Sequence, residues 1–161
     1  MFGYLKQFVY VQLARDRLMV RDPKTHESIS EVPEVAYTKN GALSILAVGA
    51  EARTAASAAG AILANSFAHP RSLLSDFALA EHVLKGFLKR LRPSASLLPN
   101  PAFVMHPLGE HEGGLTQIEI RVIRELALGA RASEVVVWQG VALSDEQLLE
   151  GTFPADGKVL G

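Results

Sequence analysis

A run of apolar residues spaced at steps of three and four between positions 76 and 91 constrains this fold more than any other feature. The run contains Phe77, Ala80, Val83, Leu84, Phe87, Leu88 and Leu91. This spacing places the apolar side chains on one face of a helix. Ser75 or Asp76 can cap its start, and Arg92-Pro93 ends it. The sequence therefore predicts an amphipathic helix that packs one face against a sheet.

Short β-branched and apolar segments predict the strands of that sheet. Strands are expected at 8–13 and 17–21 as a hairpin, at 43–48, 102–105 and 133–138, with an extended stretch at 28–38 around Pro33. Further helices are expected at 50–59 and 116–128, and turns at 22–25 and 39–41. Hairpin strands followed by alternating helices and strands predict an α/β fold, in which a mixed sheet is flanked by helices.

Length and charge exclude several classes of protein. The chain has 161 residues, enough for one domain with a sizeable core. Its 16 basic and 17 acidic residues leave no positive excess to hold a nucleic-acid backbone, so no nucleic-acid partner is expected. The absence of cysteine excludes disulfides and zinc sites of the cysteine type. No apolar run reaches the roughly 18 residues needed to span a bilayer, and the start lacks signal-peptide features, so we expect a cytoplasmic protein.

The second half of the chain carries a string of residues that identifies a candidate family. The string comprises residues 104–109, 116–125, 129–130 and 134–137, with weaker matches at 47–49 and 76–77. It resembles the bacterial actin homologue MreB, the rod shape-determining protein family. The resemblance covers roughly residues 8–140 and implies one half of an actin-like, ribonuclease H-like ATPase fold. It also implies ATP-dependent filament assembly beneath the cytoplasmic membrane. We expect a single domain over 1–151 and a mobile tail over 152–161.

The chain departs from this family where the nucleotide should bind. The family's first phosphate loop reads Asp-Leu-Gly-Thr, whereas residues 11–14 here read Val-Gln-Leu-Ala. A Cβ in place of glycine blocks the close approach of a phosphate, and valine cannot hold magnesium. Arg15 and Arg17 can attract phosphate but lack the backbone cradle. The family's Glu-Glu-Pro is replaced by residues 139–141, Gln-Gly-Val, and half of a two-domain cleft supplies only one wall.

Glu119 matches a functional residue of the family. The resemblance implies that this glutamate positions the attacking water during ATP hydrolysis. Thr116 and Glu119 also form the sequence of a capping box, which explains the glutamate without any ligand. Residues 110–114 form an insertion just before this helix. We therefore expect a capping role for Glu119, with catalysis as the alternative.

A group of possible metal ligands lies in the loop before this helix. His106, Glu110, His111 and Glu112 are of the right residue types, but their spacing fits no metal-binding template. We therefore expect a solvated polar loop and no metal site. Gly113-Gly114 could offer free amides to an anion, although a flexible entry to the helix is the simpler expectation.

The first eight residues resemble the amphipathic segment with which MreB proteins lie on a membrane. Phe2, Leu5 and Phe8 recur at roughly helical spacing, with Lys6 and Gln7 on the other side. So short a segment makes a weak anchor. The alternative is that these aromatic residues begin the first strand or pack on the domain.

These observations favour an MreB-like scaffold or interaction protein, associated with the cytoskeleton or cell shape and vestigial for ATP hydrolysis. Its expected partners are another protein or a second copy, with weak contact to the inner membrane surface. No cofactor is expected. The alternative is a nucleotide-binding protein or ATPase whose second cleft wall comes from a partner chain or a homodimer, and it alone would use ATP and magnesium.

Overall fold

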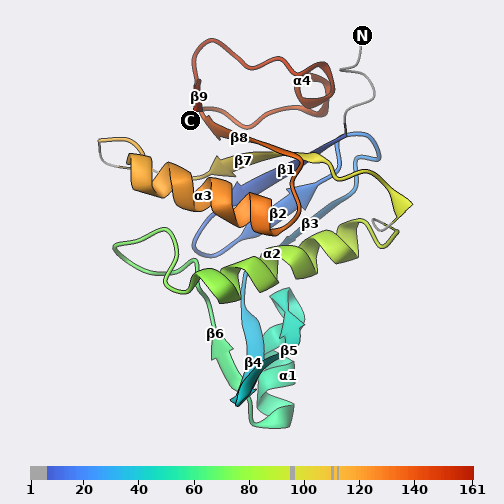
Figure 1. Ribbon diagram of the computed structural model, residues 1–161, viewed down its shortest axis with the longest axis vertical. Coiled ribbons are helices and arrows are strands. Elements are labelled where there is room, and N and C mark those ends of the chain that lie inside the picture. The colour runs from blue at the N-terminus through green and yellow to red at the C-terminus, as the bar shows by residue number, and fades with distance from the viewer. Residues whose placement is uncertain (1–6, 95–96, 110, 112) are drawn as a thin grey trace.

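The structure is a computed structural model that describes residues 7–94, 97–109, 111 and 113–161. Its centre is a six-stranded sheet in the order β3-β2-β1-β7-β8-β9 (Figure 1). The strands are β1 Phe8–Leu13, β2 Leu18–Arg21, β3 Ser28–Glu31, β7 Ala102–Pro107, β8 Glu134–Gln139 and β9 Lys158–Leu160. Strands β1, β7 and β8 run parallel, and the other neighbours pair antiparallel. The predicted mixed sheet is confirmed.

Two helices cover one face of this sheet. They are α2, Phe77–Leu91, and α3, Gln117–Gly129. Asp76 caps α2 because its carboxylate accepts a hydrogen bond from the amide of Leu79, 3.0 Å away. The apolar stripe predicted from the sequence faces the sheet from Ala80 onward, where Val83 and Phe87 are buried, whereas Phe77 at its start is 39% exposed. The predicted packing of this helix is therefore confirmed.

The segment between β8 and β9 covers the opposite face of the sheet. The segment after β8 forms the short helix α4, Asp145–Glu150, which lies on the side of the sheet away from α2 and α3 (Figure 1). Leu143 and Leu148 are buried there against Tyr10, Val104 and Trp138. The sheet is thus the middle of three layers, and the chain supplies both outer ones.

The expected mobile tail at 152–161 is wrong for its last residues. Lys158–Leu160 forms β9, which pairs with β8 so that Val159 lies opposite Trp138. Gly157 permits this approach, because any Cβ at that position would overlap the Trp138 ring. A charged residue, Lys158, suits an edge strand, but three residues are too few to predict one from sequence.

A small lobe projects from the large sheet below α2 (Figure 1). It contains β4 Val35–Asn40, β5 Ala42–Val48 and β6 Ile62–Ala64 in the order β5-β4-β6. A 3-10 turn, η2 Gly49–Glu51, leads into α1, Ala52–Ala59, which covers one face through Ala52 and Ala56. The extended stretch expected at 28–38 is divided at Pro33, with β3 in the large sheet and β4 in the small one.

None of the helices in the described residues is both long enough and apolar enough to cross a membrane.

Candidate functional site

A cleft of about 610 Å³ opens where β1 and β7 end. The carboxyl ends of parallel strands are where open α/β sheets bind ligands. The walls come from the β1–β2 turn, the segment before α2, the end of β7 and the first turns of α3. Its lining residues are Leu13, Ala14, Arg15, Phe67, His69, Pro70, Arg71, Ser72, Leu73, Leu74, Leu108, Gly109, His111, Glu119, Ile123 and Leu126.

The four positions matched to a phosphate loop are divided between the two faces of the sheet. Val11 is fully buried in the core beneath α2 and α3. Gln12 turns to the other face, where its amide nitrogen donates to the Tyr10 hydroxyl at 3.2 Å. Leu13 and Ala14 line the cleft. The Ala14 amide donates to the carbonyl of Arg17 at 3.0 Å. This hydrogen bond closes the turn, so the amide already has a partner within it.

The two arginines of the same turn have different surroundings. Arg15 lines the cleft and donates to the Ala68 carbonyl at 3.4 Å, while its own carbonyl accepts from Asn65 at 2.9 Å. Arg17 instead donates to the Ser30 carbonyl of β3 at 2.9 Å. The predicted pair of phosphate-attracting cations is therefore reduced to Arg15 in this cleft.

Glu119 reaches the cleft but is held by its own helix. Its Oε1 accepts a hydrogen bond from the Thr116 amide at 2.9 Å, and the Glu119 amide donates to Thr116 Oγ1 at 3.1 Å. Both halves of the predicted capping box are thus confirmed. This hydrogen bond satisfies an amide that the helix start would otherwise leave unpaired.

The charge of the lining favours anions. Among the described residues of the lining, the charged side chains are Arg15, Arg71 and one carboxylate, Glu119. Leu13 takes the place of the glycine that would let a phosphate reach the turn backbone. The cleft can therefore attract a negative group through side chains, without the backbone cradle of a phosphate loop.

The possible metal ligands do not gather into a site in the part of the chain that the structure describes. His106 is buried on the α4 side of the sheet, where its Nδ1 lies 2.5 Å from the Tyr10 hydroxyl. His111 lines the cleft on the other side, and Glu110 and Glu112 lie outside the described residues. Among described residues no group of three His, Asp or Glu could hold a metal ion.

The predicted membrane-contact residues are only partly described. Phe2 and Leu5 lie outside the described residues. Phe8 begins β1, where it is partly buried and packs against the Tyr10 cluster beneath α4.

Sequence reasoning missed a second, cationic groove of about 580 Å³ at the opposite end of the large sheet. Among the described residues, the lining contains Lys85, Lys89, Arg92 and Arg131 together with Leu88, Leu98 and Phe103, and no carboxylate. Outside the lining, Glu81 pairs with Lys85 at 2.8 Å. Arg92 is only 9% exposed and donates to Gln7 Oε1 at 2.7 Å. Leu97, beside this groove in sequence, is 85% exposed. The basic residues at the end of α2, followed by Leu97 and Leu98, were the feature of the sequence that could have predicted this groove.

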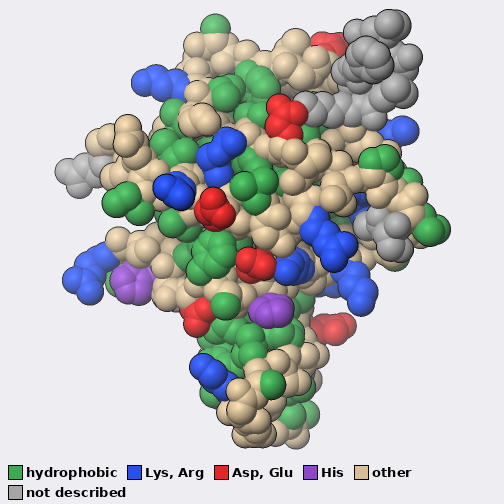
Figure 2. All heavy atoms as spheres, viewed as in Figure 1, with side chains coloured by type: hydrophobic (Ala, Val, Ile, Leu, Met, Phe, Trp, Pro, Cys, Tyr) green, Lys and Arg blue, Asp and Glu red, His purple; other side chains and the backbone are tan. Residues whose placement is uncertain are grey.

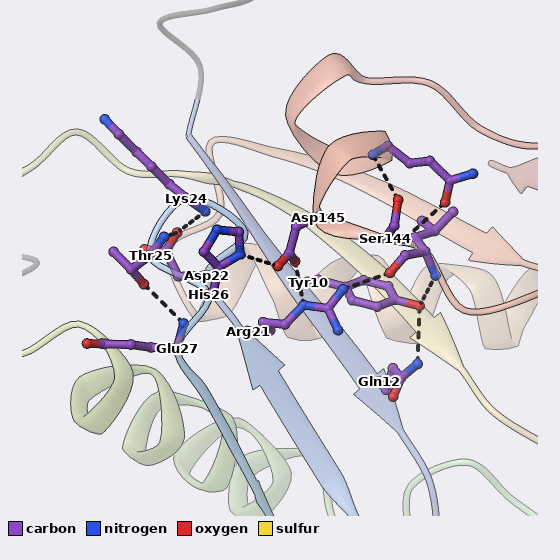
Figure 3. A network of polar contacts seen from close by, with 12 residues as sticks. Tyr10, Gln12, Arg21, Asp22, Lys24, Thr25, His26, Glu27, Ser144 and Asp145 are labelled. Carbon is purple, nitrogen blue, oxygen red and sulfur yellow. Dashed lines mark hydrogen bonds and ion pairs between the residues drawn. The ribbon is translucent and has the colours of Figure 1, made fainter.

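A polar network between the hairpin and α4 was also missed (Figure 3). Asp145 accepts from Arg21 Nε at 2.7 Å and lies 2.6 Å from His26 Nδ1. Arg21 also donates to the Leu143 carbonyl at 2.7 Å and stacks over the Tyr10 ring. The Tyr10 hydroxyl in turn accepts from the Leu143 amide at 3.1 Å. These contacts fasten the last layer to the sheet.

Solved structures of MreB5 from Spiroplasma citri share this fold. The form bound to ADP matches with a TM-score of 0.61 and 16% identity, over 83% of this chain and 38% of that one. The form bound to AMPPNP matches with a TM-score of 0.63 and 16% identity, over 82% and 38%. At such low identity the likeness shows the fold alone, which is actin-like, as the resemblance implied.

The comparisons by sequence show no family for this chain. The uncharacterized protein YjaA of Escherichia coli strain K12 is 36% identical over 70 residues, which cover 40% of this chain and 55% of that protein. No known protein-family model matches the sequence. The chain therefore spans 38% of the MreB5 structures and 55% of YjaA.

Proposed function

We propose that this chain is an MreB-like scaffold or interaction protein, associated with the bacterial cytoskeleton or cell shape, which acts through protein and membrane contacts without hydrolysing ATP. The actin-like fold supports the cytoskeletal part of the proposal, because that fold is shared with MreB5. Fold likeness is only an analogy for function, so the proposal depends on the state of the cleft.

The observation that carries the loss of hydrolysis is the hydrogen bond between Glu119 and the Thr116 amide. A carboxylate that orients water beside a terminal phosphate must be directed at that water. Here one oxygen is committed to the helix start instead. Leu13 supports the same conclusion, since a side chain stands there in place of the glycine that lets a phosphate approach the backbone.

The cationic groove and exposed leucines support contact with a membrane surface. Lys85, Lys89 and Arg131 are exposed beside Leu98, which is 43% exposed, and Leu97 is more exposed still. Anionic headgroups attract such cations, and apolar side chains insert between the headgroups. Gln7, the first described residue, accepts a hydrogen bond from Arg92 of the same groove.

Isothermal titration of the full chain with ATP and magnesium tests the loss of nucleotide chemistry. We expect no saturable binding and no phosphate release above a protein-free control. Micromolar binding would contradict the proposal, and release of phosphate that disappears in Glu119→Gln would restore the catalytic role.

Flotation with vesicles of phosphatidylglycerol and phosphatidylcholine tests the membrane contact. The wild type should float with the vesicles, Leu97→Asp and Lys89→Glu should remain at the bottom, and salt should weaken the binding. Leu149→Asp on α4 is the matched control, because Leu149 is 46% exposed on a different layer. Equal flotation of all variants, or none for the wild type, would contradict the contact.

The second candidate is a nucleotide-binding protein whose other cleft wall comes from a partner chain or a second copy. The cationic side chains of Arg15 and Arg71 in the lining favour it. Titration of ATP over rising protein concentration separates the two functions. Binding that appears only once the protein self-associates would support this candidate.

A further inference from the structure

The strand β5 is an unprotected edge of the small sheet. Its seven residues, Ala-Leu-Ser-Ile-Leu-Ala-Val, contain no charge and no proline. It lies at the end of the order β5-β4-β6. Natural edge strands are generally short or carry lysine, proline or a covering segment, because a bare edge offers unpaired backbone groups to another strand.

The other edges follow that rule. β3 has four residues and contains Glu31, β9 has three and contains Lys158, and β6 has only three. In the described part of the chain, no backbone hydrogen bond joins Ala42–Ala47 to any segment besides its partner β4. Since β5 is also the longest of the four edge strands, it is the place where a further strand can add.

The side chains on β5 extend an apolar surface toward this edge. Ile45 lies opposite Tyr37 on β4, and Tyr37 lies opposite Ile62 on β6. Directly opposed residues point to the same face, so these three side chains form one row across the sheet. Leu46, at the bulge in β5, is 43% exposed, and Ile62 is 51% exposed. Figure 2 shows hydrophobic side chains gathered over this lobe.

We propose that β5 pairs antiparallel with β5 of a second copy of this chain. The pairing creates a six-stranded sheet, β6-β4-β5-β5-β4-β6, around a two-fold axis. This inference deepens the scaffold function proposed above, because it names the partner as a second copy and gives the surface.

Charge and symmetry favour a second copy over an unrelated strand. An uncharged strand can face its own copy without opposing like charges. A two-fold arrangement also uses the same edge on both copies and closes after two chains. Exposed Lys39 lies at the end of β4 beside the start of β5, and exposed Glu51 follows the end of β5. Antiparallel pairing brings the lysine end of one copy beside the glutamate end of the other.

The expected association is weak and dependent on concentration. One strand edge from each copy makes a small interface compared with the roughly 1,200–2,000 Å² of stable complexes. Weak contacts of this kind gain strength when copies are held together, for example on a membrane.

Sedimentation equilibrium of the full chain over rising concentration is the first test. The wild type should shift from monomer to dimer and go no further. Ser44→Lys and Leu46→Lys should each weaken the dimer by at least about tenfold, because they place like charges across the strand pair. Ile62→Lys is the matched control on the opposite edge of the same sheet and should dimerise as the wild type does. Circular dichroism of each variant identifies any that fails to fold.

Single cysteines test the geometry, and the chain contains none of its own. Opposed residues in antiparallel strands have Cα atoms about 4.5–5.5 Å apart, which a disulfide can bridge. One of Ser44→Cys, Ile45→Cys and Leu46→Cys should form a cross-linked dimer on mild oxidation, and Ile62→Cys should not. Cross-linking at residue 62 alone would overturn the proposal.

A wild type that stays monomeric at all concentrations, or lysine variants that dimerise as well as it does, would also overturn this inference. Neither result would contradict the scaffold function if the chain still floats with vesicles and binds no ATP. Conversely, a chain that dimerises through β5 but hydrolyses ATP would contradict the proposed function and support the pairing.

Discussion

Arg90 on α2 donates two hydrogen bonds to Glu31 on β3, from Nη1 to Oε1 at 2.8 Å and from Nη2 to Oε2 at 2.6 Å. The same Oε1 accepts from the amide of Ala50 at 2.9 Å, where the chain turns from the small sheet into α1. One carboxylate therefore joins the large sheet, its main helix and the small lobe.

Loss of this carboxylate should weaken the joint between the lobes. Arg90, through its hydrogen bonds to the carboxylate, lowers the pKa of Glu31 to about 2. Glu31→Gln should reduce the free energy of unfolding by about 1 kcal/mol at pH 7, a modest value because Arg90 is half exposed. Urea unfolding measures this loss, and Glu27→Gln on the exposed turn is the control.

The same ion pair predicts a pH dependence. Because the pKa of Glu31 is lower in the folded state, its contribution is complete above about pH 4.5 and is lost as the pH falls toward 2. Wild type and Glu31→Gln should therefore converge in stability over this range. A constant difference between them down to pH 2.5 would contradict the role of the charged pair.

Gly49 should resist substitution for a related reason. Its φ is +82°, and a Cβ there would overlap Glu31 Oε1 and press on Phe87. Gly49→Ala should cost about 2–3 kcal/mol, from strain in the left-handed backbone and displacement of the ion pair. Gly60→Ala is the control, because Gly60 also has a positive φ but no atom within 4 Å of a Cβ, and it should cost about 1 kcal/mol. Thermal unfolding of the two variants gives the comparison.

Glu119 should behave as a helix cap. Glu119→Gln keeps an oxygen for the Thr116 amide and should change stability by less than about 0.5 kcal/mol, whereas Glu119→Ala should cost about 1 kcal/mol. Thr116→Ala should cost a similar amount, since it removes the other half of the box. A glutamine variant as unstable as the alanine variant would show that the cap depends on charge.

His106 should make the α4 layer sensitive to mild acid. Burial lowers the pKa of His106, partly offset by a hydrogen bond with the backbone of Gly140. The unfolded chain therefore takes up this proton first, and stability should fall as the pH drops below about 6.5. His106→Gln keeps an acceptor for Tyr10 and should flatten that fall, as measured by urea unfolding between pH 7.5 and 5. An unchanged slope would assign the acid sensitivity to other groups.

Local patterns predicted the elements whose residues carry their own signal. The stripe around Val83 and Phe87 predicted α2, and Thr116 with Glu119 predicted the start of α3. The hairpin followed from its β-branched strands and the polar turn at 14–16. Each of these signals lies within about one turn or one strand of the structure it forms, so neighbouring residues suffice.

Contacts between distant residues could not be predicted in this way. His106 meets Tyr10 across 96 positions, and Asp145 meets Arg21 across 124. His106 therefore resembled a loop ligand rather than a buried side chain. The strands β6 and β9 have three residues each and exist because a neighbouring strand is in place. The cationic groove likewise gathers Lys89 and Arg131 from two helix ends that only the fold brings together.

The network that fastens α4 has a consequence for synthesis. Arg21 and His26 have no Asp145 to pair with during early synthesis, because Asp145 is made more than a hundred residues later. Until then the face of β1 and β2 that carries the Tyr10 ring lacks the α4 layer, which packs on it in the described structure. The nascent protein thus exposes the apolar surface around Tyr10 for most of its translation. During that interval it depends most on a chaperone.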